Sequence, residues 1–254
     1  MMKIGVFGAT GRIGKLLLEE ISSDADLELG SVFVRKELDI SLPKGTFVTN
    51  DLEIFIQHCD VIVDFSLPEA TKALLHALTS NPKPIVCGTT GLENSTLKEI
   101  DKLSENMPIL YATNMSQGVA MLGEMATMLS KILSEADIEI SEIHHRYKKD
   151  APSGTAITLG QKCAKARGLD LSKVRISSRD GNIGQRSKDE IAIMSLRGGD
   201  IAGKHTIGFY MDGEYIEITH NATSRLTFAK GAIKAAKWLI KQKNGLYEID
   251  NIFR

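Results

Sequence analysis

The feature that most constrains this chain lies near its start, where a short apolar run is followed by three spaced glycines and a helical pattern. Residues 3–7 predict a strand, and residues 15–21 carry apolar side chains at helical spacing. Between them lie Gly8, Gly11 and Gly14. A glycine turn between a strand and a helix lets the backbone approach a pyrophosphate, which the helix N-terminus attracts. We therefore expect a dinucleotide-binding turn; the alternative is a tight turn that only lets the helix pack closely.

Apolar runs and helical segments continue to alternate through the first half of the chain. This alternation is typical of a parallel sheet covered by helices on both faces, so we expect an α/β Rossmann-type, doubly wound parallel sheet. Pro68 is well placed to open one of the helices. The expected strands are residues 3–7, 27–34, 61–65, 85–87 and 109–111, and the expected helices are residues 15–21, 68–78 and 92–103.

The pattern changes in the second half. A long helix is expected over 119–133, and residues 138–145 alternate as a strand does. Asp212-Gly213 separates two further strand-like runs and is a strong hairpin signal. We expect a second, α+β domain that contains a mainly antiparallel sheet, and an amphipathic helix over 227–241. Because of its lysines, binding of this helix to a membrane surface is an alternative. Trp238, Leu239 and Ile240 favour packing on a core instead.

Composition excludes several classes of protein. The 254 residues have an ordinary globular composition and a formal net charge of −1, so nothing points to a nucleic-acid partner. Cys59, Cys87 and Cys163 stand far apart, which favours a reducing cytoplasm over a disulfide framework and offers zinc no cysteine pair. We see no signal peptide and no membrane-spanning run, and we expect no metal site.

The end of the second strand bears on the choice of cofactor. An adenosine ribose without a 2′-phosphate usually meets an acidic residue about 20 positions after the glycine turn. Here that position is Val34, and Arg35 and Lys36 follow it. Cations favour a 2′-phosphate, and Arg12 in the glycine turn adds to them. We expect NADPH to be preferred, with NADH use still open; the alternative is that these cations are merely solvated.

The densest group of chemically active side chains runs from Glu142 to Ala156, across a strand end, a loop and a helix start. His144 and His145 should point to opposite faces of the strand, so they should not share one role. Ser153 is expected to cap the next helix, whose first N–H groups would face an anion. We expect a carboxylate-binding pocket beside a proton donor. The alternatives are a satisfied core histidine, a solvated lysine loop and, least favoured, a metal site.

These residues resemble the 4-hydroxy-tetrahydrodipicolinate reductase (dihydrodipicolinate reductase) family of bacterial and plant lysine biosynthesis. The resemblance spans essentially the whole chain, and the string from Glu142 to Ala156 is its most specific part. The other matching segments are GATGRIG at 8–14, DFSLPEAT at 64–71, VCGTTG at 86–91, YATNMSQG at 111–118, GGDIAGKHT at 198–206 and THNATSRLTFAKGA at 219–232.

The resemblance implies NAD(P)H-dependent reduction of (2S,4S)-4-hydroxy-2,3,4,5-tetrahydrodipicolinate to 2,3,4,5-tetrahydrodipicolinate with loss of water, in the diaminopimelate route to L-lysine. It implies that His144 donates or accepts a proton and that Lys148 donates one. The implied contacts of the cyclic imine dicarboxylate are His145, Gly154 and Thr155. The implied cofactor-binding residues, beside the Arg35 inferred above, are Gly8, Ala9, Thr10, Gly11, Arg12, Ile13, Gly88, Thr89, Thr90, Ala112, Thr113, Asn114 and Met115.

The resemblance also implies a domain plan and an assembly. The final helix would return to the nucleotide domain, giving a discontinuous dinucleotide-binding domain of residues 1–115 plus 225–254. Residues 116–224 would form the substrate-binding and oligomerisation domain. Members of the family usually form homotetramers through the sheets of that domain. Several members carry an acidic residue at the position of Val34, and its absence here argues against strong NADH use.

Two other functions fit parts of the sequence. Short-chain reductases also carry a GxxGxxG turn, but they typically need Tyr-x-x-x-Lys for proton transfer. None of the five tyrosines is followed by lysine four positions later, which weakens that hypothesis. A non-catalytic NADP sensor would bind the nucleotide without any need for His144 or Lys148.

Overall fold

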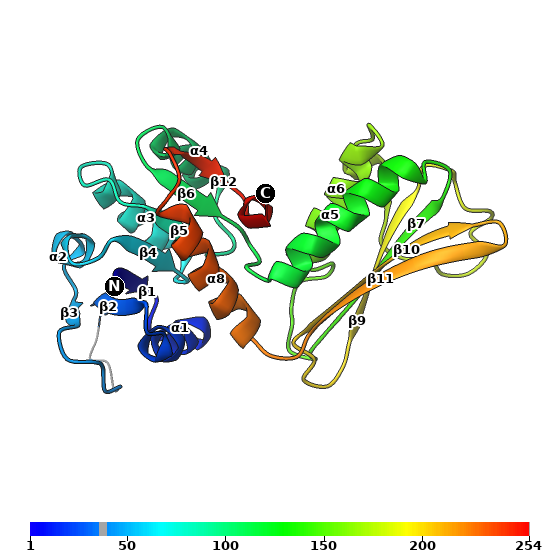
Figure 1. Ribbon diagram of the computed structural model, residues 1–254. Coiled ribbons are helices and arrows are strands. Elements are labelled where there is room, and N and C mark those ends of the chain that lie inside the picture. Colours follow the sequence, from blue (N-terminus) through cyan, green and yellow to red (C-terminus); the bar gives the residue numbers. More distant parts are fainter. Residues whose placement is uncertain (36–39, 254) are drawn as a thin grey trace. The chain divides into compact units, whose positions relative to one another are not determined.

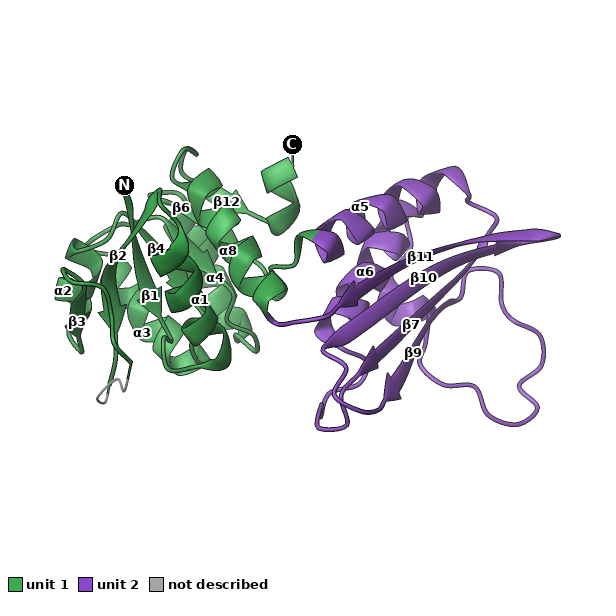
Figure 2. Ribbon diagram, turned by 60° about the horizontal axis from the view of Figure 1, so that its bottom comes forward, with its two compact units in different colours: residues 1–117, 226–254 green, residues 118–225 purple. Residues whose placement is uncertain are grey.

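The computed structural model describes residues 1–35 and 40–253. The chain divides into two compact units, coloured separately in Figure 2. Unit 1 is Met1–Gln117 with Leu226–Arg254, and unit 2 is Gly118–Arg225. These limits lie within two residues of the domain limits expected from the sequence, and the C-terminal helix belongs to unit 1. Each unit has a sheet and a hydrophobic core of its own.

Unit 1 contains the parallel sheet that the alternating pattern predicted. Over the described residues its strand order is β12-β6-β5-β4-β1-β2-β3, and each neighbouring pair is parallel. Helices α1 and α8 pack together on the sheet, and α2, α3 and α4 form a second group (Figure 1). The strands are β1 (Met2–Phe7), β2 (Leu27–Phe33), β3 (Phe47–Thr49), β4 (Val61–Asp64), β5 (Ile85–Cys87), β6 (Pro108–Tyr111) and β12 (Gly245–Tyr247). The helices are α1 (Arg12–Ser23), α2 (Leu52–Gln57), α3 (Pro68–Leu78), α4 (Asn94–Ser104), α8 (Leu226–Leu239) and the 3-10 helix η1 (Ile249–Phe253).

The strand order reverses in the middle of this sheet. From β1 the chain adds β2 and β3 on one side, and from β4 it adds β5, β6 and β12 on the other. In open parallel sheets, the connections that leave β1 and β4 in opposite directions open a crevice beyond the carboxyl ends of those strands. This reversal is the place in unit 1 where a ligand is expected to bind.

Four short elements of unit 1 were not predicted from the sequence: β3, β12, α2 and the 3-10 helix η1. β3 and β12 have three residues each, too few to show a periodicity. Asp51 caps α2 by accepting hydrogen bonds from the N–H groups of Glu53 and Ile54. The prediction that Ile240 enters the core was wrong, because α8 ends at Leu239 and leaves Ile240 exposed.

Unit 2 is built on a mixed sheet in which most of the paired residues lie in antiparallel ladders. Over the residues described, the strand order is β11-β10-β7-β9-β8. The β7–β10 and β10–β11 pairs are antiparallel, whereas β7–β9 and β8–β9 are parallel. The elements are α5 (Gln117–Ile132), β7 (Asp137–His144), α6 (Gly154–Ala166), α7 (Leu171–Val174), β8 (Arg175–Ile176), β9 (Ile191–Arg197), β10 (Gly203–Met211) and β11 (Glu214–Ala222).

Strand β7 alternates between a buried and a half-buried face, as the sequence predicted. Its buried face begins with Ile138 and Ile140, which join the core, and ends with the polar Glu142 and His144. The buried face therefore changes from apolar to polar toward the carboxyl end of the strand. The predicted Asp212-Gly213 hairpin joins β10 to β11, and Gly213 adopts the positive φ of 85° that such a turn requires.

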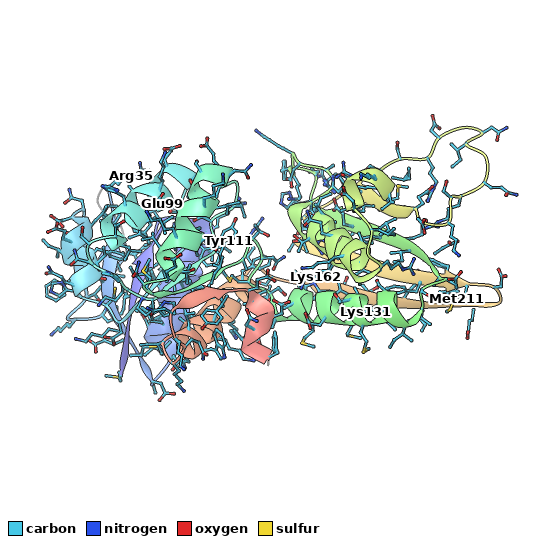
Figure 3. All side chains as sticks on the ribbon, turned by 90° about the horizontal axis from the view of Figure 1, so that it is seen from above. Arg35, Glu99, Tyr111, Lys131, Lys162 and Met211 are labelled. Carbon is cyan, nitrogen blue, oxygen red and sulfur yellow. The ribbon has the colours of Figure 1, made fainter. Side chains whose placement is uncertain are left out.

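Helices α5 and α6 are linked by polar as well as apolar contacts. Lys162 of α6 lies 3.7 Å from the carboxylate of Glu124 on α5, and the side chain of Lys162 is labelled in Figure 3. The stem of Lys162 also covers Gly123, where an added Cβ would approach it to 3.0 Å. In the described part of the chain, no helix is both long and apolar enough to cross a membrane.

Helix α8 packs on unit 1 so closely that one position requires glycine. A Cβ built on Gly231 would lie 1.7 Å from the carbonyl oxygen of Met115, at the end of the segment that follows β6. Lys237 of the same helix donates to the carboxylate of Asp24 at 2.6 Å. The close approach and this ion pair hold α8 against the rest of unit 1.

We predict that Gly231→Ala lowers the free energy of unfolding by an amount at the upper end of the range of about 1–3 kcal/mol typical of overpacking. The added methyl group must push α8 away from the backbone at Met115. The matched control is Gly198→Ala, because an added Cβ at Gly198 meets no atom within 4 Å among the described residues and its φ is not positive. Urea unfolding of both variants measures the difference, and equal stability of the two would contradict the close packing of α8.

Candidate active site

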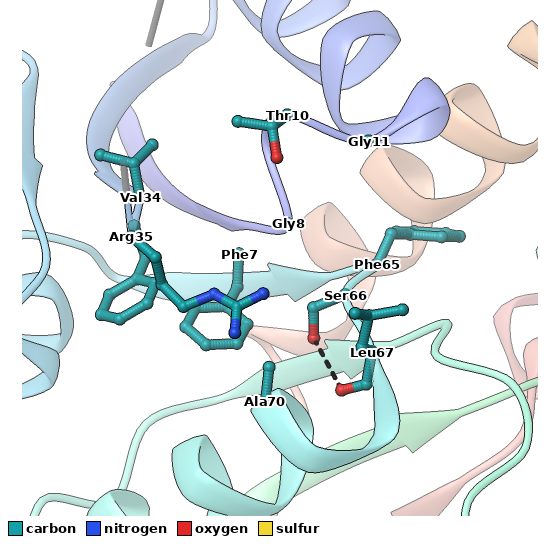
Figure 4. Close-up of a pocket in the computed structure, with 11 residues that line it drawn as sticks. Phe7, Gly8, Thr10, Gly11, Val34, Arg35, Phe65, Ser66, Leu67 and Ala70 are labelled. Carbon is teal, nitrogen blue, oxygen red and sulfur yellow. Dashed lines mark hydrogen bonds between the residues drawn. The ribbon is translucent and has the colours of Figure 1, made fainter. Parts of the chain in front are cut away.

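A cavity of about 820 Å³ opens in unit 1 where the strand order reverses (Figure 4). Three segments line it, and they follow the carboxyl ends of β1, β2 and β4. The lining residues are Phe7, Gly8, Thr10, Gly11, Phe33, Val34, Arg35, Phe65, Ser66, Leu67 and Ala70. The cavity is large enough for a nucleotide portion of a cofactor, and it lies where a dinucleotide binds in folds of this class.

The glycines of the predicted turn shape this cavity. Gly8 has a φ of 90°, and a Cβ built on it would lie 2.4 Å from the carbonyl oxygen of Phe65. A Cβ on Gly14 would lie 2.2 Å from the oxygen of Gly8, so this glycine lets α1 pack against the turn. Gly11 caps α1 with no side-chain hydrogen bond to the first turn. Pyrophosphate binding and close helix packing, set out as alternatives from the sequence, are therefore compatible uses of one turn.

Of the other cofactor residues predicted in the first 36 positions, two line the cavity and three lie in or behind the glycine turn. Thr10 and Arg35 line the cavity, and the Arg35 guanidinium extends into it in Figure 4. Ala9 is buried behind the turn, while Arg12 and Ile13 begin α1. Lys36, the second cation of the sequence argument, lies outside the described residues.

Two further segments that the resemblance assigned to the cofactor follow β5 and β6. Ala112 donates its N–H to the carbonyl of Cys87 at 3.1 Å, so the segments that hold Gly88–Thr90 and Ala112–Met115 run side by side. A Cβ on Gly88 would lie 2.5 Å from the ring of Phe65, a residue of the cavity wall. The predicted members of these segments are Gly88, Thr89, Thr90, Ala112, Thr113, Asn114 and Met115.

A buried carboxylate connects the β4 and β5 segments. Asp64, at the end of β4, accepts hydrogen bonds from the Thr71 hydroxyl at 2.6 Å and from the Ser66 N–H at 2.9 Å. The Thr71 hydroxyl also lies 3.0 Å from that of Thr89. Burial raises the pKa of Asp64, although these hydrogen bonds act in the opposite direction. The network ties the cavity wall at Ser66 to the turn at Thr89, and the sequence analysis assigned it no role.

In unit 2, the polar end of β7 carries the second group of predicted residues. The carboxylate of Glu142 is buried and accepts a hydrogen bond from His144 Nδ1 at 2.6 Å. Arg197, at the end of β9, reaches it with two guanidinium nitrogens at 2.8 and 2.9 Å. The N–H of Ser153 donates to the same carboxylate at 3.1 Å. His144 is thus held by a carboxylate that two other groups orient, the Arg197 guanidinium and the Ser153 N–H.

Electrostatics set the charges of this cluster. Burial opposes ionisation of Glu142, but hydrogen bonds from Arg197 and His144 outweigh it and lower its pKa to about 2. Burial lowers the pKa of His144, although Glu142 acts against that change. His205 of β10 packs edge-on against His144, with ring centroids 5.1 Å apart, and its Nε2 lies 3.2 Å from the Ser153 hydroxyl. Burial and the neighbouring His144 lower the pKa of His205 to about 4.

The loop after β7 brings Lys148 and the start of α6 to this end of the sheet. Lys148 lies 2.9 Å from the carboxylate of Asp150, and its backbone N–H donates to His145. Ser153 caps α6 as predicted, accepting the N–H of Ala156 at 3.3 Å. His145 lies beyond the last residue of β7 and is half-buried, unlike the buried His144. The two adjacent histidines therefore occupy different environments, as expected, but the reason differs from the predicted strand alternation because the strand ends at His144.

The predicted substrate contacts are Gly154 and Thr155, besides His145. Gly154 is the first residue of α6 and is exposed, and no described atom lies within 4 Å of a Cβ built on it. Thr155 follows it in the first turn and is half-buried. This open helix start, next to the buried polar cluster, can accommodate an anionic group.

The sequence analysis missed two members of the cluster and the role of a third. Arg197 and His205 lie on β9 and β10, far along the chain from β7, and only strand pairing brings them together. Glu142 was noted within the string but received no role. The register places His205 opposite Glu142 and Arg197 opposite His144, a relation that no local spacing reveals.

We predict that His205 makes unit 2 sensitive to acid. Above pH 6.5 the residue is neutral in both states and contributes nothing. Between pH 6.5 and 4 the unfolded chain binds a proton that the folded chain does not, so stability falls as pH falls. The folded-state pKa of about 4 makes this loss about 3 kcal/mol at pH 4.

Urea unfolding at several pH values measures the effect. His205→Gln should give a shallower decline of stability between pH 6.5 and 4 than the unaltered chain. His76→Gln on α3 is the control, because His76 is exposed and should leave the slope unchanged. Identical slopes for all three proteins would show that His205 does not titrate as its burial requires.

The chain is similar to known proteins over nearly its whole length. The family model of the N-terminus of dihydrodipicolinate reductase matches residues 2–115, and that of the C-terminus matches residues 118–253. A protein of Helicobacter hepaticus named 4-hydroxy-tetrahydrodipicolinate reductase is 65% identical over 251 residues, covering 99% of this chain and 98% of the relative. A protein of Wolinella succinogenes with the same name is 62% identical over 252 residues, with 99% and 98% coverage.

Solved structures show the same fold. The dipicolinate-bound dihydrodipicolinate reductase of Paenisporosarcina sp. TG-14 matches with a TM-score of 0.81 and 23% identity, over 99% of each chain. An engineered D-amino acid dehydrogenase bound to NADP+ matches with a TM-score of 0.57 and 14% identity, over 98% of this chain and 93% of that one. Given the two family models and relatives of this identity over nearly full length, the chain belongs to the dihydrodipicolinate reductase family.

Proposed function

We propose that this chain reduces 4-hydroxy-tetrahydrodipicolinate to tetrahydrodipicolinate with a nicotinamide dinucleotide, releasing water, in the diaminopimelate route to lysine. One observation supports this most: a single chain carries both a cavity at the strand reversal of unit 1 and the His144–Lys148 cluster of unit 2. Relatives 50–65% identical to it carry the name of this reductase. The short-chain reductase hypothesis is set aside, since the chain belongs to a different family.

The residues of unit 1 fit a dinucleotide. Gly8 and Gly14 let the turn pack tightly, because a Cβ at either position would clash with a backbone oxygen. A tight glycine turn at a helix N-terminus suits a pyrophosphate. Gly11 leaves the first turn of α1 without a side-chain cap. Hydrogen bonds from the Ser66 N–H and the Thr71 hydroxyl connect Thr89 to the cavity wall. When bound, the dinucleotide supplies the hydride of the reduction.

NADPH is the proposed preferred cofactor, and NADH a second one. Arg35 lines the cavity beyond the end of β2, and its fork of N–H groups suits a phosphate. Val34 stands at the position where an adenosine ribose without a 2′-phosphate usually meets an acidic residue, and it donates its backbone N–H to Thr49 at 2.9 Å. No carboxylate lines the described cavity to receive a 2′-hydroxyl.

In unit 2, we assign proton transfer to His144 and Lys148. Loss of water places a proton on the leaving hydroxyl and releases one from the neighbouring ring carbon, so it consumes no proton overall. Reduction of the ring then consumes one hydride and one proton. His144 presents Nε2 while Glu142 holds Nδ1. Lys148 is ion-paired with Asp150, and its ammonium group has three N–H bonds that can donate.

The proposed substrate is a dicarboxylate, and the first N–H groups of α6 can bind one of its carboxylates. We place one carboxylate at the N–H groups of Gly154 and Thr155, where the helix dipole favours an anion. His145 provides a further polar contact at the same end of the sheet. The positive charge of Arg197 is already engaged by Glu142, so it orients the site more than it binds the substrate.

Three broader assignments complete the proposal. Unit 1 serves as the dinucleotide-binding domain and unit 2 as the substrate-binding and oligomerisation domain. We expect a homotetramer, for which the edge strand β11 offers exposed Tyr215 and Ile216. We also place the protein in the cytoplasm, where its three buried, unpaired cysteines, all in described parts of the chain, would stay reduced.

We predict that His144→Ala and Lys148→Ala each lower kcat by about 10²- to 10⁴-fold, the usual contribution of a general acid or base. The measurement is oxidation of NADPH when the purified protein receives the enzymatically generated substrate. Lys149→Ala is the control, because Lys149 is the exposed neighbour of Lys148 and should keep full turnover. Full turnover by the double variant would refute the proposed proton transfer, and nucleotide binding without any turnover by the unaltered chain would favour the sensor hypothesis.

We predict that Arg35→Glu weakens NADPH binding by about 10- to 100-fold, the value of a charge-assisted contact to a phosphate, and changes NADH binding much less. Titration of the protein with each nucleotide measures both constants. Lys98→Glu makes the same change in net charge on the exposed face of α4 and should alter neither. Equal losses for both nucleotides would rule out a contact between Arg35 and the 2′-phosphate.

A further inference from the structure

The Glu142 carboxylate is saturated with hydrogen-bond donors. Its Oε2 accepts from His144 at 2.6 Å and from Arg197 at 2.8 Å. Its Oε1 accepts from Arg197 at 2.9 Å and from the Ser153 N–H at 3.1 Å. Arg197 and a backbone N–H can only donate, so a proton on either oxygen would displace one of these bonds. The carboxylate is therefore an acceptor toward His144, and the hydrogen of that bond belongs to Nδ1.

The other nitrogen of His144 faces a glycine. A Cβ built on Gly203, at the start of β10, would lie 3.0 Å from His144 Nε2 and 3.4 Å from Cδ2. Any larger residue at this position would crowd the Nε2 edge of the ring. Gly203 has an ordinary φ, so conformational freedom does not explain why a glycine is needed. Space next to Nε2 does explain it.

Arg197 connects this carboxylate to the loop that carries the second proton group. Its Nη2 donates to the backbone carbonyl of Asp150 at 2.6 Å as well as to Glu142. The side chain of Asp150 in turn pairs with Lys148 at 2.9 Å. One guanidinium therefore orients the partner of His144 and the residue that holds Lys148.

We propose that Glu142, held by Arg197, is a positioning residue that keeps the hydrogen of His144 on Nδ1, so that Nε2, left open by Gly203, is the atom that exchanges the proton. This inference rests on the proposed function for the proton exchange, and on geometry alone for the position of the hydrogen. The low pKa of Glu142 agrees with it, since the carboxylate stays ionised while His144 is neutral.

The first measurement is made without substrate. Nitrogen NMR of the ¹⁵N-histidine-labelled protein at pH 8 distinguishes a protonated from an unprotonated imidazole nitrogen, and the spectrum of His144→Gln identifies the His144 signals. We expect Nδ1 to carry the hydrogen and Nε2 to be bare. A hydrogen on Nε2 in the unaltered protein would overturn the inference outright.

Glu142→Gln tests the positioning. Arg197 can only donate, so it should take the amide oxygen and turn the amide NH₂ toward His144. The hydrogen of His144 should then move to Nε2, and kcat should fall about 10²-fold or more while KM changes little. Glu139→Gln is the matched control: Glu139 lies on the same strand, faces the other side, and is also ion-paired, in its case with Arg179 and Arg186. It should change neither the tautomer nor kcat.

Gly203→Ala provides a second variant that leaves the carboxylate intact, in case Glu142→Gln does not fold. The added methyl group should leave the hydrogen on Nδ1 and lower kcat about 10-fold or more by crowding Nε2. Unchanged turnover in this variant would overturn the assignment of Nε2. A lower kcat in Glu142→Gln with the hydrogen still on Nδ1 would also overturn the inference, because Glu142 would then have only a structural role.

The proposed function can fail separately. If the unaltered chain binds NADPH but reduces no substrate, the reductase assignment is wrong. The NMR comparison of Glu142→Gln with Glu139→Gln would still decide whether Glu142 sets the tautomer. If the tautomer changes as expected while kcat does not, Glu142 positions the ring but Nε2 does not exchange the proton, and the inference is overturned in its catalytic part.

Discussion

The buried carboxylate of Glu142 is the interaction on which the candidate site of unit 2 depends. It joins the end of β7 to the end of β9 through Arg197 and to the start of α6 through the Ser153 N–H. A buried charge that loses its partner costs about 3–5 kcal/mol, so each of these elements is held in place by the need to satisfy one group. The helix start, the strand end and the histidine ring cannot move independently. The proposed anion binding and proton transfer depend on this relative placement.

Unit 1 also has a buried carboxylate that accepts several hydrogen bonds at the end of its sheet. Asp64 ends β4 as Glu142 lies near the end of β7, and it gathers the N–H and hydroxyl groups of the loops that follow. In both units a buried acid meets donors from loops at the carboxyl ends of strands, where backbone groups leave the ladder and need new partners. The loops that line the cavity of unit 1 are therefore ordered by a residue that lies beneath them.

Much of the fold could be predicted because its signals are local. The strand, glycine turn and helix at the start of the chain follow from spacing alone, and so do the hairpin at Asp212-Gly213 and the Ser153 cap. Elements of three residues, such as β3 and β12, are too short to show a pattern. Ile240 illustrates another limit, since an apolar residue in a helical pattern still lies outside if the helix ends before it.

The sequence by itself determined the fold class, the glycine turn and the string that carries His144 and Lys148, because each depends on neighbours along the chain. Only the tertiary structure decided which partners those residues have. Arg197 lies 55 residues from the carboxylate it binds, and His205 lies 52 residues from the hydroxyl of Ser153. These contacts exist because β9 and β10 pair with β7 in one particular register, and a shift by one residue would turn each side chain to the other face of the sheet. Strand register, a property of distant segments, therefore completes a site whose central residues are local in sequence.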